Sequence, residues 1–157
     1  EAEVFMVDIN QKALDLARVN AGLAGTANAV ARRSDLLTGL RGEFDLIVAN
    51  PPYLVDPAQR TYRHGGGPLG AELSLAILDA ALERLSSGGT LVLYTGAAVV
   101  KGEDPFRAAA AERLARSGAR WAYREMDPDV FGTELEAEAY RHADRVAAVV
   151  LTVDQDG

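Results

Sequence analysis

The tetrapeptide Asn50-Pro51-Pro52-Tyr53 is the part of the sequence whose residue types best suit chemistry. Two consecutive prolines form a stiff, extended turn, so the Asn50 side-chain oxygen and the Pro51 carbonyl oxygen are held in a fixed direction. Two convergent acceptors can receive both hydrogens of a planar NH2 group and orient its nitrogen. The Tyr53 ring can stack on the flat group that carries this nitrogen. The alternative is a rigid loop with Tyr53 packed as a core aromatic, but the position of the motif after a buried strand favours function.

Two acids stand at or near the ends of two further predicted strands. Asp8 closes the apolar run that begins at Val4, and Asp35 follows the run that ends at Arg33. Ligands bind at the carboxyl ends of the strands in open parallel sheets. A carboxylate there can accept hydrogen bonds from two vicinal ribose hydroxyls, or from an exocyclic amine such as that of adenine. Taken alone, Asp8 is better explained as a strand-end or helix-capping acid, and Asp35 as a loop acid that caps the turn around Leu36-Leu37.

Alternating apolar runs and amphipathic stretches predict an α/β domain with a mostly parallel sheet. Strands are expected at residues 4–8, 29–33, 44–49, 90–95, 121–126 and 145–153. Helices are expected after Asn10, over 72–85, where Ser86-Ser87-Gly88-Gly89 would end the helix, and over 105–117. The last two strands lack a helix of crossover length between them, so they should pair antiparallel. Residues 54–70 have no periodicity and predict a long loop, of which 56–69 should be mobile without substrate.

Composition narrows the class of protein. The 157 residues suit one domain, 1–157, and the absence of cysteine excludes disulfides, thiolate nucleophiles and cysteine-based metal sites. The two histidines lack ligand spacing, so no metal is expected. With 16 Lys+Arg against 23 Asp+Glu the net charge is −7, which does not attract nucleic acid. No apolar run approaches the roughly 20 residues of a membrane span. The expected location is therefore the cytoplasm, away from any membrane.

The chain resembles the class I S-adenosylmethionine-dependent methyltransferases that carry an Asn-Pro-Pro-Tyr motif. Residues Phe44–Tyr53 resemble the catalytic strand and motif of this family, and this match is the most specific. Val7-Asp8-Ile9-Asn10 and the helix after it resemble the second strand and its helix. Ser34-Asp35-Leu36-Leu37 resembles the adenine-contacting loop, and Leu85–Leu91 resembles the turn into the fifth strand. The similarity spans essentially the whole chain.

The resemblance implies S-adenosylmethionine as the cofactor and a role for each matched residue. Asp8 with Ile9 would bind the cofactor ribose, and Asp35 with Leu36 would bind its adenine. Asn50, Pro51, Pro52 and Tyr53 would hold the acceptor nitrogen, with Asn50 also touching the cofactor. The reaction would be methyl transfer to a planar amide or amino nitrogen.

One part of the family pattern is not in this sequence. The first strand of the family and its Gly-rich cofactor loop precede the acid of the second strand, whereas this chain begins at Glu1 within a predicted strand. The expected fold is therefore a Rossmann-like methyltransferase sheet that lacks the first strand, in an N-terminally incomplete domain. A rival class, a non-catalytic binding module with a degenerate methyltransferase fold, follows from the same observation.

Within the family, the chain most resembles the protein-(glutamine-N5) methyltransferases that modify peptide release factors. The motif itself accepts any NH2 on a flat group, so an adenine or guanine base of ribosomal RNA or DNA is the alternative acceptor. The net charge favours a protein glutamine, because Arg60, Arg63 and His64 are too few for a phosphate footprint. The stretch Gly65–Gly70 loosely resembles a Gly-rich loop of the glutamine-modifying branch, and a flexible surface loop fits it equally well.

Overall fold

The computed structural model describes residues 2–157, which divide into two compact units. One unit ends at Gly42, and the other comprises Glu43–Gly157. The sequence-based assignment of residues 1–157 to a single domain stays a prediction.

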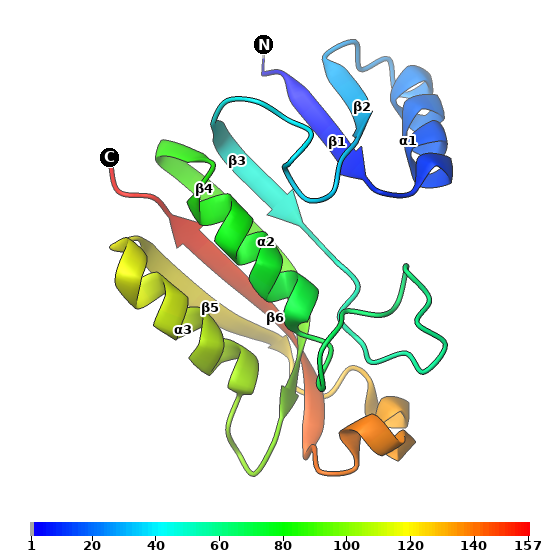
Figure 1. The fold of residues 1–157 in the computed structure, drawn as a ribbon, viewed down its shortest axis with the longest axis vertical. Coiled ribbons are helices and arrows are strands. Elements are labelled where there is room, and N and C mark those ends of the chain that lie inside the picture. The colour runs from blue at the N-terminus through cyan, green and yellow to red at the C-terminus, as the bar shows by residue number, and fades with distance from the viewer. Residues whose placement is uncertain (1) are drawn as a thin grey trace. The chain divides into compact units, whose positions relative to one another are not determined.

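The first unit is a strand–helix–strand motif (Figure 1). Its strands β1 (Val4–Asp8) and β2 (Ala29–Arg33) pair in parallel. Helix α1 (Gln11–Leu23) connects them in the sequence. The Asn10 side chain accepts a hydrogen bond from the Lys12 N–H at 3.0 Å and begins the helix. These strands and the capping role of Asn10 confirm the sequence-based prediction.

The second unit contains a mixed four-stranded sheet in the order β3-β4-β6-β5. Its strands are β3 (Phe44–Ala49), β4 (Leu85–Val99), β5 (Arg120–Asp127) and β6 (Arg145–Asp154). Strands β3 and β4 are parallel, whereas β6 runs antiparallel to both β4 and β5. The predicted antiparallel pairing of the last two strands is therefore confirmed, and the α/β fold has the expected mixed sheet.

Two helices cover one face of this sheet, α2 (Glu72–Leu82) and α3 (Pro105–Ser117) (Figure 1). Proline at the start of α3 and Gly118 in the left-handed conformation after its end limit this helix as its sequence predicts. Two short 3-10 helices, η1 (Gly132–Glu136) and η2 (Glu138–Tyr140), occupy the irregular segment before β6. In residues 2–157, no helix is long and apolar enough to cross a membrane.

The boundary between α2 and β4 differs from the prediction. The helix ends at Leu82 rather than Leu85, and Ser86–Gly89 lie inside β4, which continues to Val99. Pairing decides this boundary, because Leu85 pairs with Phe44 of β3 before the register shifts. A Cβ on Gly89 would lie 2.8 Å from the Phe44 carbonyl oxygen, so glycine at this position serves close strand approach rather than a turn.

The main core lies between the two helices and the central strands. It is built from the apolar faces of α2, α3, β4 and β6, including Leu78, Leu91, Leu93, Phe106, Leu114, Val149 and Leu151. A smaller cluster of Leu54, Ala98, Tyr140 and Val146 lies where the chain leaves β3 and β4. The two clusters give the carboxyl ends of β3 and β4 a rigid base.

Strand β3 is one of the two edge strands of the second sheet, and β5 is the other. On β3, Leu46 is 59% exposed and Val48 is 71% exposed, which is unusual for a strand of such apolar sequence. The strands of the predicted Rossmann-like sheet form two sheets, one with two strands and one with four.

Candidate functional site

The Asn50–Tyr53 turn begins where β3 ends, as the sequence predicts. Asn50 is exposed, and its side-chain amide has no hydrogen-bond partner among residues 2–157. Pro51 is buried and Pro52 is half-buried, so the two rings anchor the turn. The Asn50 amide oxygen is therefore available as an acceptor on a backbone that the prolines stiffen.

The Tyr53 ring packs in an aromatic cluster at the end of the sheet. Its centroid lies 6.2 Å from that of Tyr94 and 5.5 Å from that of Phe131. A Cβ on Gly96 would lie 2.5 Å from Tyr53 Cδ2, so this edge of the ring lies directly against the β4 backbone. Burial, together with the neighbouring Tyr94 hydroxyl, raises the pKa of Tyr53. Tyr53 is thus a neutral, half-buried side chain that is partly a packing residue, as the alternative interpretation proposed.

Two glycines of the 65–70 stretch support the same turn from the other side. A Cβ on Gly65 would lie 2.7 Å from the Pro52 carbonyl oxygen, and one on Gly70 would lie 2.3 Å from that of Tyr53. Gly65 is buried, and its N–H donates to the Leu54 carbonyl at 2.8 Å. This part of the loop is therefore packed tightly against the motif, which a freely flexible surface loop would not be.

A buried carboxylate organises the loop that follows the motif. Asp56 is 3% exposed and accepts hydrogen bonds from Arg60 Nε at 2.8 Å and Nη2 at 2.7 Å. These hydrogen bonds to the Arg60 guanidinium hold the pKa of Asp56 well below its usual range. Arg63 pairs with Glu134, and the Asp56 N–H donates to His64 Nδ1 at 3.1 Å.

The ion pairs in this loop reduce the positive charge that is available near the motif. Arg60 and Arg63, the positive groups nearest the motif, are each paired with a carboxylate. They therefore offer less to a phosphate backbone than unpaired arginines would. The mobility of residues 56–69 without substrate stays a prediction.

In the first unit, Asp8 and Asp35 lie at the carboxyl end of the two-stranded sheet. The Ser34 N–H donates to the Asp8 carbonyl at 3.2 Å, which brings the two strand ends together. Asp8 Oδ1 accepts from the Asn10 N–H at 2.7 Å, so the strand-end interpretation of Asp8 holds for one oxygen. Asp8 Oδ2 and the Asp35 carboxylate have no partner among residues 2–157.

The unpaired oxygens of Asp8 and Asp35 can be compared with the hydrogen-bond donors of S-adenosylmethionine, the cofactor that the sequence suggests. Ribose hydroxyls and an adenine amine are hydrogen-bond donors, and two exposed carboxylates with unpaired oxygens fit them. Ile9 is exposed beside Asp8, and Leu36 has a left-handed backbone with a φ of 49° beside Asp35. The residues present therefore fit the adenosine part of S-adenosylmethionine. All four belong to the first unit, whereas Asn50–Tyr53 belong to the second.

Sequence reasoning missed several residues around the motif. Tyr94 and Gly96 of β4 contact Tyr53, and the hydroxyls of Ser74 and Thr95 lie 2.7 Å apart beneath them in the core. A glycine inside an apolar strand is typical of close approach by another group, so Gly96 carried a usable signal. The Ser74–Thr95 pair carried none, because the two residues are 21 positions apart.

Comparison with known proteins identifies the class. The family described as "Methyltransferase small domain" matches residues 1–101. The chain therefore belongs to this family of class I S-adenosylmethionine-dependent methyltransferases, as its sequence motifs predicted. Among solved structures, a methyltransferase from Pyrococcus furiosus superposes with a TM-score of 0.66 at 19% identity, covering 99% of this chain and 64% of that one.

Two relatives narrow the comparison. The chain is 34% identical over 151 residues to the release factor glutamine methyltransferase of Deinococcus radiodurans, covering 90% of this chain and 50% of that protein. It is 38% identical over 105 residues to the ribosomal protein uL3 glutamine methyltransferase of Xanthomonas campestris pv. campestris, covering 60% of this chain and 34% of that protein. The chain thus spans half or less of the length of these relatives.

Proposed function

We propose that the protein transfers a methyl group from S-adenosylmethionine to the side-chain amide nitrogen of a protein glutamine, of the release factor type. The observation that carries this proposal is the free Asn50 amide on the proline-stiffened turn at the end of β3. The two relatives at 34% and 38% identity, both glutamine methyltransferases by name, support the choice of acceptor.

The residues of the turn would act by orienting the acceptor. The Asn50 side-chain oxygen and the Pro51 carbonyl accept the two hydrogens of the glutamine NH2 group and fix the direction of its nitrogen. The half-buried Tyr53 ring, held by Tyr94 and Phe131, contacts the flat amide. Positioning of this kind supplies up to about 7–11 kcal/mol of a barrier in favourable cases.

The first unit would hold the cofactor. Asp8 with Ile9 would bind the ribose, and Asp35 with Leu36 would bind the adenine. Asn50 of the second unit would also contact the cofactor. When bound, S-adenosylmethionine supplies an electrophilic methyl group on a sulfonium. The chain's part is to align the acceptor nitrogen with that methyl group and to keep water from competing.

Cofactor binding is open to a direct test. Calorimetry with S-adenosylmethionine on residues 1–157 and on a chain extended at its N-terminus tests this proposal. Binding by the extended chain alone supports it, and binding by neither supports the rival non-catalytic module.

The assignment of roles is tested by two substitutions in the full-length protein. Asn50→Ala should lower kcat by about 100-fold or more with little change in cofactor Kd, because it removes an acceptor that orients the reacting nitrogen. Asp8→Ala should weaken cofactor binding by about tenfold and leave kcat at saturating cofactor nearly unchanged. Equal effects of both substitutions on both quantities would refute the assignment.

The acceptor is tested by tritiated-methyl transfer. The full-length protein is offered release factor, ribosomal protein uL3, ribosomal RNA and DNA separately, and label is expected in release factor. The net charge of −7 and the paired arginines support a protein acceptor. Label in a nucleic acid alone would refute the proposed glutamine acceptor, whereas the assignments of the fold and of the cofactor would stand.

A further inference from the structure

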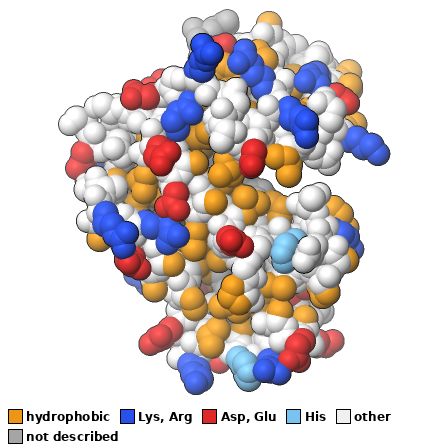
Figure 2. Space-filling model, viewed as in Figure 1, with side chains coloured by type: hydrophobic (Ala, Val, Ile, Leu, Met, Phe, Trp, Pro, Cys, Tyr) orange, Lys and Arg blue, Asp and Glu red, His pale blue; other side chains and the backbone are white. Residues whose placement is uncertain are grey.

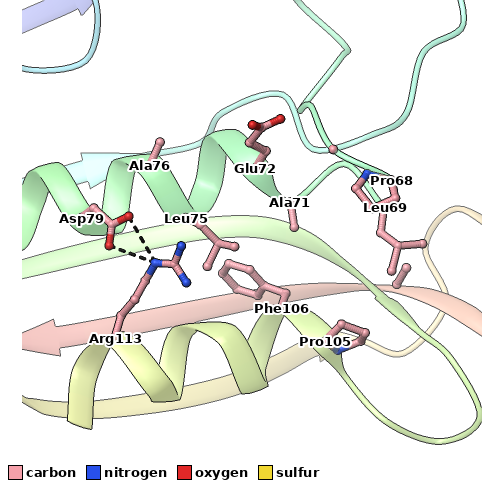
Figure 3. Close-up of a pocket in the computed structure, with 12 residues that line it drawn as sticks. Pro68, Leu69, Ala71, Glu72, Leu75, Ala76, Asp79, Pro105, Phe106 and Arg113 are labelled. Atoms are coloured by element: carbon pink, nitrogen blue, oxygen red, sulfur yellow. Dashed lines mark hydrogen bonds and ion pairs between the residues drawn. The ribbon is translucent and has the colours of Figure 1, made fainter. Parts of the chain in front are cut away.

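A cavity of about 490 Å³ opens between α2, α3 and the glycine loop of the second unit. In Figure 3, Ala71, which immediately precedes α2, and Leu75 of α2 point toward α3, opposite Phe106, and Leu69 lies at one end. The volume is in the range of sites that bind an organic group. Seen from the side of these helices, the second unit shows apolar side chains interspersed with charged ones (Figure 2).

The charges around the cavity do not cancel. Three charged residues line it, and Arg113 Nε binds Asp79 at 2.9 Å and 3.2 Å, which compensates that acid. Glu72, in the first turn of α2, has no partner among residues 2–157 and is exposed. A Cβ on Gly66 would lie 2.7 Å from Glu72 Oε2, so the carboxylate lies over the loop backbone. The cavity therefore favours an apolar group that carries a cation next to it.

The cavity and the Asn50–Tyr53 turn share one wall. Gly65 and Gly70 pack against the carbonyls of Pro52 and Tyr53, whereas Gly67–Leu69 between them line the cavity. A chain segment bound at the turn thus reaches the cavity by crossing a single loop. This continuity favours the substrate protein as the occupant over a separate small molecule.

We propose that this cavity binds the substrate protein beside its acceptor glutamine, taking one apolar side chain between α2 and α3 and pairing a neighbouring lysine or arginine with Glu72. The proposal rests on the proposed function, because it takes the Asn50–Tyr53 turn as the acceptor site. It adds a sequence preference on the substrate that the turn alone does not supply, since the turn contacts only the amide.

The test measures peptide binding and methyl transfer with the full-length protein. The probes are fluorescent peptides with a central glutamine, a leucine, and an arginine beside the leucine, in a series that varies the spacing from glutamine to leucine from two to five residues. Glu72→Lys should weaken binding of the best peptide at least tenfold and raise its KM without changing kcat. Glu83→Lys, the same change at an exposed position near the end of the same helix, should leave both within twofold.

Two further variants separate recognition from misfolding. A peptide with glutamate in place of the arginine should bind weakly to the natural protein and regain affinity for Glu72→Lys, which damage to the fold could not produce. Ala71→Trp should fill the cavity and weaken every peptide, whereas Ala108→Trp, exposed on α3, should not.

Each outcome decides the proposal. Equal KM for Glu72→Lys and Glu83→Lys, or no rescue by the glutamate peptide, overturns it even if glutamine is methylated. Charge-dependent binding without label on glutamine keeps the cavity as a peptide site and refutes the proposed function. A dimer in sedimentation that Ala71→Trp abolishes would make a second copy the occupant and also overturn the proposal.

Discussion

Gly96 fixes how closely the Tyr53 ring approaches the sheet. Because a Cβ there would lie 2.5 Å from Tyr53 Cδ2, Gly96→Ala forces the ring away from β4. The free energy of unfolding should fall by about 1–3 kcal/mol, as for overpacking elsewhere. Chemical denaturation measures it, and Gly22→Ala is the control, since that helical position has open space and should gain about 0.5–1 kcal/mol. In a Tyr53→Ala background, Gly96→Ala should cost little.

Asp56 makes stability depend on pH. Its pKa is lowered in the folded protein by the hydrogen bonds from Arg60, so its ionised form stabilises the fold. This contribution is complete above the unfolded pKa of about 4 and is lost as the pH falls toward the lowered folded pKa. The difference in unfolding free energy between the natural protein and Asp56→Asn should therefore be large at pH 7 and shrink below pH of about 4.

A control for this pH dependence is available at the other end of the chain. Asp156 forms an exposed ion pair with Arg120 at 3.5 Å, and such pairs contribute about 0–1 kcal/mol. Asp156→Asn should show a small difference at every pH. A difference for Asp56→Asn that stays constant from pH 7 to pH 3 would contradict the role of the buried carboxylate.

At the scale of elements, a single polar pair joins α2 to β4 inside the core. Ser74 and Thr95 are both fully buried, and their hydroxyls lie 2.7 Å apart. Thr95→Val takes away the hydroxyl that Ser74 contacts, and Ser74→Ala leaves the Thr95 hydroxyl with only a long 3.5 Å hydrogen bond to the Gly96 carbonyl, so each should cost about 1–3 kcal/mol. The double variant should cost clearly less than the sum, because neither buried hydroxyl then remains. Additive losses in denaturant unfolding would show that the two groups are not coupled.

At the scale of the whole molecule, burial differs between the two units. Of the described residues in the first unit, four are buried, namely Leu14, Ala31, Ser34 and Leu40. The core of the second unit includes long runs of buried residues in β4 and β6. Local opening costs least where few apolar contacts hold the backbone. Hydrogen exchange of residues 1–157 should therefore be fastest in peptides from 2–42, and equal protection of β1 and β6 would refute this.

Elements with local sequence signals could be predicted before the structure was known. The apolar runs defined β1, β2 and β3, Asn10 began α1, and Pro105 with Gly118 bounded α3. The antiparallel pairing of β5 and β6 followed from the absence of a helix of crossover length between them. The methyltransferase family followed from the resemblance of Phe44–Tyr53 to the family's catalytic strand and motif, and the family model confirms it.

Features that depend on residues far apart in the chain could not be predicted from local signals. The helix signal ran to Leu85, but pairing with Phe44 made that residue the first of β4. The stretch Gly65–Gly70 fitted a flexible surface loop, and the role of Gly65 and Gly70 appeared only when the motif packed against them. The physical reason is that strand pairing and close packing reward contacts between distant segments, and such contacts override local turn and helix preferences.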